Sequence, residues 1–123
     1  MSKKILIVED DNILSNTLSL ALNDEGYTVF QAYDGEQGLK MAENEKPDLI
    51  LCDINMPIMD GITMLEKVRE ADWGKYLNFM ILTNSSDELK IYEVLKNSVF
   101  SYLVKSDWDL DTILKKIKEE LKD

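Results

Sequence analysis

Five short apolar runs, several of them rich in β-branched residues, recur along the chain and predict β-strands. The runs are Ile5–Val8, Thr28–Ala32, Leu49–Cys52, Phe79–Leu82 and Tyr102–Val104. Each has the length of an ordinary strand and is too short for an ordinary helix. The stretches between them leave room for one helix after each strand.

Those longer stretches carry apolar residues at helical spacing, three or four positions apart. The stripes are Leu14, Leu18, Ala21 and Leu22; Leu39 and Ala42; Ile62, Leu65 and Val68; Leu89, Tyr92 and Leu95; and Leu110, Ile113, Leu114, Ile117 and Leu121. Asp11 or Asn12 can cap the first helix, and Asp34-Gly35 marks a turn into the second. The chain therefore alternates strand and helix five times.

This alternation predicts an α/β fold with a doubly wound, five-stranded parallel sheet covered by helices on both faces. The chain shows no internal repeat, low-complexity tract or interdomain linker. We therefore expect residues 1–123 to form a single domain, with no output domain present.

Polar residues follow four of the five predicted strands. The first strand leads into Glu9, Asp10 and Asp11, the third into Asp53, the fourth into Thr83-Asn84-Ser85, and the fifth into Lys105. Ligands in open parallel sheets bind beyond the carboxyl ends of the strands. We therefore expect these side chains to share one rim.

Carboxylates gathered at that rim repel one another, and one lysine cannot neutralise three acids. A hard divalent cation such as Mg²⁺ can, because it prefers carboxylate oxygens and water. Mg²⁺, a lysine and a hydroxyl donor together can stabilise the oxygens of a phosphoryl group in transfer. Asp53 would then be free to act as the nucleophile. The pattern indicates phosphoryl chemistry on an aspartate.

Four motifs in order resemble the signature set of response-regulator receiver domains in two-component signalling. They are Ile-Leu-Ile-Val-Glu-Asp-Asp at 5–11, Asp-Ile-Asn-Met-Pro-Ile-Met-Asp-Gly at 53–61, Ile-Leu-Thr at 81–83 and Tyr-Leu-Val-Lys at 102–105. The resemblance covers essentially the whole chain. It implies a flavodoxin-like sheet of strand order 2-1-3-4-5, as in the single-domain chemotaxis regulators.

The resemblance also implies the roles of the acidic residues. Glu9 and Asp10 would organise Mg²⁺, with Asp10 a direct ligand. Asp53 would be both metal ligand and phospho-acceptor, and Asn55 would offer its backbone carbonyl to the metal. The phosphodonor would be the phosphohistidine of a sensor histidine kinase or a phosphotransfer protein, since this chain has no histidine.

Two further positions complete the implied site, and a third forms the switch. Thr83 would donate its hydroxyl to the phosphoryl group and Lys105 would pair with it, while Tyr102 would be the aromatic switch coupled to Thr83. Phosphorylation would then shift the surface formed by the fourth helix, fifth strand and fifth helix. That surface would bind a downstream protein, and a phosphorylation-dependent dimer is compatible with it.

We expect a domain that catalyses its own phosphorylation and slow dephosphorylation rather than a conventional enzyme.

The chain departs from the family pattern at three places. Ser106 replaces the proline that usually follows the lysine, Asn84 replaces a smaller residue after Thr83, and Asn97-Ser98-Val99 replaces an Ala-Gly-Ala type of turn. None of these changes removes a reactive group. Asn55, Asn84 and Ser85 are the side chains that we expect to govern the lifetime of the phosphoryl group.

The composition of the chain argues against several other classes of protein. The formal charge of −10, from 24 acidic against 14 basic residues, argues against a surface for nucleic acid or anionic membranes. Cys52 is the single cysteine and cannot form an internal disulfide. The first apolar run is too short for a signal peptide or a membrane span, so a cytoplasmic location is expected.

Two other classes of protein remain compatible with parts of the pattern. A phosphatase or mutase of the haloacid dehalogenase kind also uses an aspartate nucleophile with Mg²⁺, but it would carry a second acid where this chain has Asn55. A pseudo-receiver would use the fold for binding without phosphorylation. It would be expected to lack the acceptor or an acidic partner, and this chain lacks neither. The protein would be a stand-alone regulator or a receiver cut from a longer protein.

Overall fold

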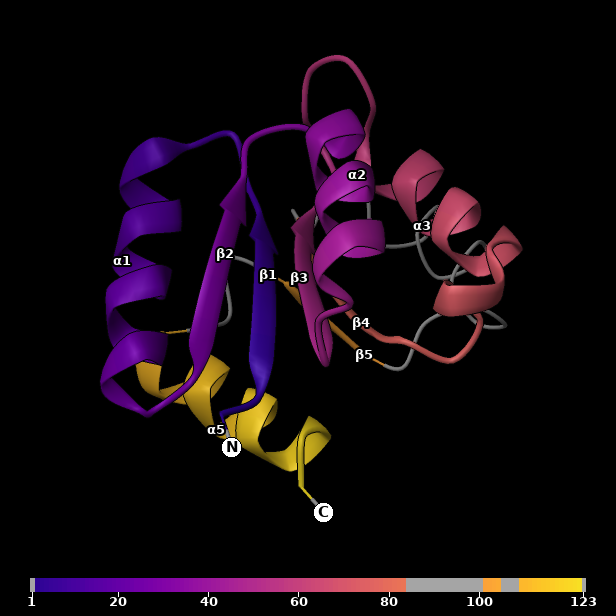
Figure 1. Ribbon diagram of the computed structural model, residues 1–123. Helices are drawn as coiled ribbons and strands as arrows, with labels where there is room; N and C mark the ends of the chain where they lie inside the picture. The colour runs from indigo at the N-terminus through magenta and orange to yellow at the C-terminus, as the bar shows by residue number, and fades with distance from the viewer. Residues whose placement is uncertain (1, 84–100, 105–108, 123) are drawn as a thin grey trace.

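The computed structural model describes residues 2–83, 101–104 and 109–122, and within them the chain forms a five-stranded parallel sheet (Figure 1). The strand order is β2-β1-β3-β4-β5, which confirms the expected doubly wound topology. The strands are β1 (Lys4–Val8), β2 (Thr28–Ala32), β3 (Leu49–Asp53), β4 (Asn78–Thr83) and β5 (Ser101–Val104).

Helices follow the strands as the apolar spacing indicated. They are α1 (Asn12–Asp24), α2 (Gly35–Glu45), α3 (Gly61–Glu70), the short 3₁₀ helix η1 (Asp72–Gly74) and α5 (Leu110–Glu120). The fourth helix expected around Leu89, Tyr92 and Leu95 lies outside the described residues. In the part of the chain that the structure describes, no helix is long and apolar enough to cross a membrane.

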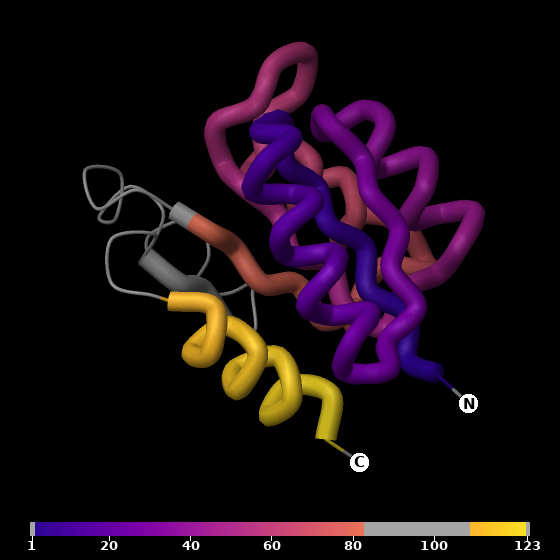
Figure 2. Tube along the Cα trace, turned by 90° about the vertical axis from the view of Figure 1, so that its left-hand side faces the viewer, coloured from indigo at the N-terminus to yellow at the C-terminus, as the bar shows by residue number. Residues whose placement is uncertain are grey.

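The sheet separates two apolar layers, because successive residues of a strand point to opposite faces. In β1, Leu6 and Val8 face α2 and α3, whereas Ile5 and Ile7 face α1 and α5. β3 is buried along its whole length, as expected for a central strand of a parallel sheet. Figure 2 shows α1 and α5 running on the same side of the sheet, where Lys118 of α5 contacts Glu25 at 2.8 Å.

An aspartate caps the start of each of the four α-helices that the structure describes. The caps are Asp11, Asp34, Asp60 and Asp109, whose side chains accept hydrogen bonds from backbone N–H groups of the first turn. Such caps satisfy donors that have no partner within the helix. The first cap is therefore Asp11 and not Asn12.

The doubly wound order places the carboxyl ends of all strands at one edge of the sheet. β1 is followed by a helix on one face and β3 by a helix on the other, so the switch point lies between these two strands. The arrows of β1 and β2 point to the upper edge in Figure 1, and the two ends of the chain lie at the lower edge. The expected site and the chain ends are therefore at opposite edges.

Candidate functional site

Glu9 and Asp53 lie side by side because their strands are paired. The register of β1 and β3 sets Val8 opposite Cys52, so the next residue of each strand reaches the same rim. Glu9 also continues the ladder, since its N–H donates to Ala32 O at 3.0 Å. The two side chains are only 1% and 5% exposed.

Asp10 completes a cluster of three carboxylates with Glu9 and Asp53. One carboxylate oxygen from each residue lies within 4.8 Å of the others, and Asp10 is the exposed member. Oxygens on opposite sides of one Mg²⁺ ion are about 4 Å apart, since Mg–O distances are about 2.0–2.1 Å. The three oxygens are therefore close enough to share one such ion, directly or through water. The donor set fits magnesium.

Backbone N–H groups orient two of these carboxylates. Asp53 Oδ1 accepts a hydrogen bond from the N–H of Ile54 at 2.8 Å, and Glu9 Oε2 accepts one from the N–H of Asp11 at 3.2 Å. These bonds orient the two carboxylates in surroundings that exclude most water. The acids are thus positioned by the local backbone before any ion or phosphoryl group arrives.

Asp11 itself serves the helix. Its Oδ1 accepts from the N–H of Ile13 at 3.0 Å and from that of Leu14 at 3.2 Å. The sequence offers Asp11 both as a helix cap and as one of the acids that follow the first strand, and in the structure it is the cap of α1.

Gly61 lets the first turn of α3 pack directly against the backbone of Asp53. A Cβ at this position would lie 2.2 Å from the carbonyl oxygen of Asp53, and the N–H of Gly61 donates to Ile54 O at 2.9 Å. In the sequence, Gly61 is only the last residue of the motif at 53–61. Its close approach to Asp53 depends on the packing of α3, which no local pattern reveals.

Cys52 is a buried thiol next to Asp53. Burial raises the pKa of the Cys52 thiol well above its usual range, and the negative charges of Asp53, Glu9 and Asp60 raise that pKa further. The thiol donates to the backbone carbonyl of Asp53 at 3.1 Å. A protonated thiol is a poor nucleophile.

For the other predicted site residues, we give only the element or loop in which each one lies. Asn55 is an exposed residue at the start of the loop between β3 and α3. Thr83 is the last residue of β4, one position after Leu82, which pairs with Asp53. Tyr102 lies in β5 and pairs with Ile81. Asn84, Ser85, Lys105 and Ser106 lie outside the described residues.

Comparison with known proteins identifies the family of the chain. Residues 5–118 match the family model of the response regulator receiver domain. Sporulation initiation phosphotransferase F of Bacillus subtilis is 34% identical over 121 residues, which cover 98% of this chain and 95% of the relative. Two other curated relatives, both transcriptional regulatory proteins, are longer, and this chain spans 44% and 35% of their lengths.

Solved structures with the same fold include two receivers. The chemotaxis response regulator CheY4 of Vibrio cholerae superposes with a TM-score of 0.88 at 32% identity, covering 98% of this chain and all of that one. The receiver domain of the sensor histidine kinase PA1611 of Pseudomonas aeruginosa gives a TM-score of 0.88 at 24% identity over the full length of both chains, and its structure has a magnesium ion coordinated in the active site cleft. By its family match and by a relative similar over nearly its whole length, this chain belongs to the response regulator receiver domain family.

Proposed function

We propose that Asp53 is the residue of this receiver domain that accepts the phosphoryl group. The observation that carries the proposal is the burial of Asp53 at the end of β3, within a cluster shared with Glu9 and Asp10. Receiver domains accept phosphoryl groups from histidine kinases, so the donor group is a partner's phosphohistidine.

Glu9, Asp10, Asp53 and the main chain of Asn55 would hold Mg²⁺. When bound, the ion offsets the negative charge of the acids and of the phosphoryl oxygens. The cluster geometry and the charge of three neighbouring carboxylates support magnesium, and a receiver domain of the same fold has a magnesium ion coordinated in its own active site cleft. Glu9 is buried and Asp10 exposed, which suits Glu9 to orienting the site and Asp10 to direct ligation.

Phosphoryl transfer then needs little covalent chemistry from the protein. An oxygen of Asp53 attacks the phosphorus in line with the nitrogen of the donor, the P–N bond breaks, and an acyl phosphate forms. Its position in the chain, directly after β5, supports Lys105 as the cation that pairs with the transferred group. Water later hydrolyses the acyl phosphate and restores the Asp53 carboxylate.

Thr83 and Tyr102 would convert this event into a change of shape. Thr83 ends β4, the strand that pairs with the strand of Asp53 on one side and with that of Tyr102 on the other. The hydroxyl of Thr83 would move toward the phosphoryl group and bind it. Tyr102 would then occupy the space that Thr83 leaves. The surface around β5 and α5, with the segment between β4 and β5, would then bind a downstream protein or a second copy of the chain.

The proposal is tested by incubation with acetyl phosphate and Mg²⁺, followed by intact mass measurement. The wild type should gain one labile phosphate and turn over little of a chromogenic phosphate ester, whereas Asp53→Asn should gain none. Turnover of the ester at the rate of a true phosphatase would favour the haloacid dehalogenase alternative. A wild type that gains no phosphate after incubation with acetyl phosphate and Mg²⁺ would favour a pseudo-receiver.

The lifetime of the signal is proposed to depend on Asn55, Asn84 and Ser85. No acid or base is available at these positions to activate water, so the bulk of Asn84 should shield the phosphorus. Asn84→Ala should therefore speed both phosphorylation by small donors and dephosphorylation, with Mg²⁺ binding near wild type. The decay rate after removal of the donor measures this, and slower decay in Asn84→Ala would mean that the amide positions the attacking water.

A further inference from the structure

The loop between β3 and α3, residues 54–60, is held in a strained conformation. Its tip is a three-residue turn closed by the N–H of Met59, which donates to Pro57 O at 2.7 Å. The central residue, Ile58, has φ 69°, and its side chain is 76% exposed. A turn of this kind with positive φ is rare, and a β-branched residue tolerates it poorly. Something outside the loop must hold the tip in place.

The first turn of α2 makes that contact. The N–H of Gly35 donates to the carbonyl oxygen of Met59 at 3.0 Å. A Cβ at position 35 would lie 2.3 Å from that oxygen and 2.9 Å from the carbonyl carbon. These are backbone atoms and cannot rotate away as a side chain could. The contact therefore requires the absence of a side chain at position 35.

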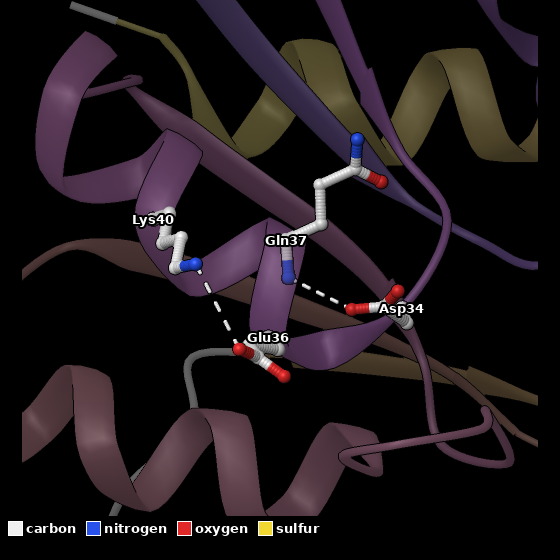
Figure 3. A network of polar contacts seen from close by, with 4 residues as sticks. All are labelled: Asp34, Glu36, Gln37 and Lys40. Carbon is white, nitrogen blue, oxygen red and sulfur yellow. Dashed lines mark hydrogen bonds and ion pairs between the residues drawn. The ribbon is translucent and has the colours of Figure 1, made fainter.

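Side-chain contacts surround the first turn of α2, and Figure 3 shows two of them, from Asp34 to Gln37 and from Glu36 to Lys40. Asp34 Oδ1 accepts from the N–H of Gln37 at 2.8 Å, and Gln37 Oε1 accepts from the N–H of Tyr33 at 2.8 Å. Lys40 and Glu36 form an ion pair at 3.7 Å one turn further along. The reciprocal bonds around Asp34 and Gln37 resemble a capping box and fix the entry to the helix. A loop tip bound to Gly35 is bound to a rigid element.

We propose that Gly35 is a positioning residue for the magnesium site, acting through the β3–α3 loop. The loop is closed at its base by the bond from Gly61 to Ile54 and at its tip by the bond from Gly35 to Met59. Asn55 lies between these two points, so both restrict its backbone. Strained residues persist where the surrounding structure over-determines them. The inference rests on the proposed function in one respect, namely that Asn55 helps to hold Mg²⁺.

The matched pair Gly35→Ala and Gly38→Ala tests this role. Both add one methyl group to α2, but at position 38 the Cβ would meet side-chain atoms of the core, Val8 Cγ1 at 2.9 Å and Met64 Cε at 3.1 Å. Titration calorimetry with Mg²⁺ should show an affinity about 10-fold or more weaker in Gly35→Ala, the size of effect seen when groups that orient metal ligands are removed. Gly38→Ala should bind Mg²⁺ as the wild type does.

Amide hydrogen exchange of the metal-free protein gives a readout that does not depend on the ion. The amides of Met59 and Gly61 should exchange faster in Gly35→Ala and at the wild-type rate in Gly38→Ala. Because Gly35→Ala can also disturb folding, a second pair of variants changes exposed side chains of α2 instead. Gln37→Ala, an exposed position, should give a smaller loss of Mg²⁺ affinity in the same direction, and Lys40→Ala should give none.

Wild-type Mg²⁺ affinity in Gly35→Ala would overturn the proposal, as would wild-type exchange of the Met59 and Gly61 amides in that variant or an equal loss of affinity in Gly38→Ala. A wild type that binds no Mg²⁺, or whose binding survives Asp10→Asn, would contradict the proposed function and with it the role of Gly35. Binding that is present in the wild type, lost in Asp10→Asn and unchanged in Gly35→Ala would contradict the role of Gly35 alone.

Discussion

At the scale of single residues, burial of Glu9 and Asp53 is the feature that most needs an explanation. Two carboxylates that are almost inaccessible to water repel each other and lose hydration. Each accepts a backbone hydrogen bond, but those bonds do not neutralise the charge. The cation that we propose would offset this repulsion and would explain why three acids are gathered at one rim.

The first prediction concerns that cation and compares Asp10→Asn with Asp11→Asn. Mg²⁺ should raise the melting temperature of the wild type, because only the folded state binds it. At 100 times the dissociation constant the stabilisation is about 2.7 kcal/mol. Asp10→Asn should abolish the rise. Asp11→Asn removes the same charge one residue later, but asparagine still caps α1, so the rise should persist.

Thermal unfolding at a series of Mg²⁺ concentrations measures both variants. Relief of repulsion can stabilise Asp10→Asn without metal, so the comparison is of the slope with Mg²⁺ and not of the melting temperature alone. A Mg²⁺ response in Asp10→Asn equal to that of the wild type would contradict the metal site.

The acids of the site could be predicted from sequence, whereas the residues that support them could not. Glu9, Asp10 and Asp53 follow apolar runs, and parallel strands bring such positions together. Gly35, in contrast, is explained by a carbonyl oxygen 24 residues away in the chain, at Met59. Ile58 carries no local signal for a positive φ, since glycine or asparagine would be the usual choice.

At the scale of helices and strands, the apolar pattern predicts the strands that the structure describes because the central strands β1 and β3 are buried on both faces. The apolar runs match the observed strands to within one residue at each end. The strands additionally include one residue at the start of β1, β4 and β5 and one at the end of β3 and β4, namely Lys4, Asn78, Ser101, Asp53 and Thr83. The short helix η1 was not anticipated, because three residues show no periodicity. In α1 the buried positions include Ser15, whose hydroxyl accepts from Gln31 Nε2 at 2.8 Å, a polar contact that an apolar stripe does not predict.

The second prediction concerns the start of α5 and its dependence on pH. The N–H of Thr112, with a further contribution from its hydroxyl, lowers the pKa of Asp109 below the ordinary value of 3.8. A lowered pKa in the folded state means that this carboxylate contributes stability above pH 3.8 and loses it as the pH falls through the folded value.

Asp109→Asn retains a cap but has no charge to titrate. The wild type should therefore exceed this variant in free energy of unfolding at pH 7, and the excess should shrink towards pH 3. Urea unfolding at the two pH values measures the difference in free energy of unfolding between the wild type and Asp109→Asn. The contributions of the other carboxylates cancel in this difference because both proteins contain them. An excess that does not change with pH would show that the carboxylate of Asp109 adds nothing to the cap.

At the scale of the whole molecule, the rim of the sheet that carries the acids also has exposed apolar side chains beside it. Ile13, in the first turn of α1, is 80% exposed, and Ile58 in the β3–α3 loop is 76% exposed. Both lie next to segments that carry the acids. If Asp53 accepts the phosphoryl group as we propose, the partner's phosphohistidine would approach it from this rim, and the partner protein would cover these side chains.

The third prediction is that Ile13→Ser slows phosphoryl transfer from a partner protein but not from acetyl phosphate. Covering an isoleucine contributes about 1.5–3 kcal/mol, which corresponds to roughly 10-fold or more in transfer efficiency. Tyr76 is 86% exposed and precedes β4, at the opposite edge of the sheet. Tyr76→Ser is therefore the matched control and should leave both rates unchanged. Equal slowing with both donors would place the effect in the site and not in docking.

The measurement that tests the central claim most directly is reductive trapping of the acyl phosphate. After phosphorylation with acetyl phosphate and Mg²⁺, borohydride reduces an aspartyl phosphate to homoserine, and peptide mass spectrometry locates the modified residue. The account predicts homoserine at position 53, dependent on Mg²⁺ and absent from the unphosphorylated protein. Homoserine at Asp10 or at another acid, or a phosphorylated protein without any reducible aspartate, would contradict it.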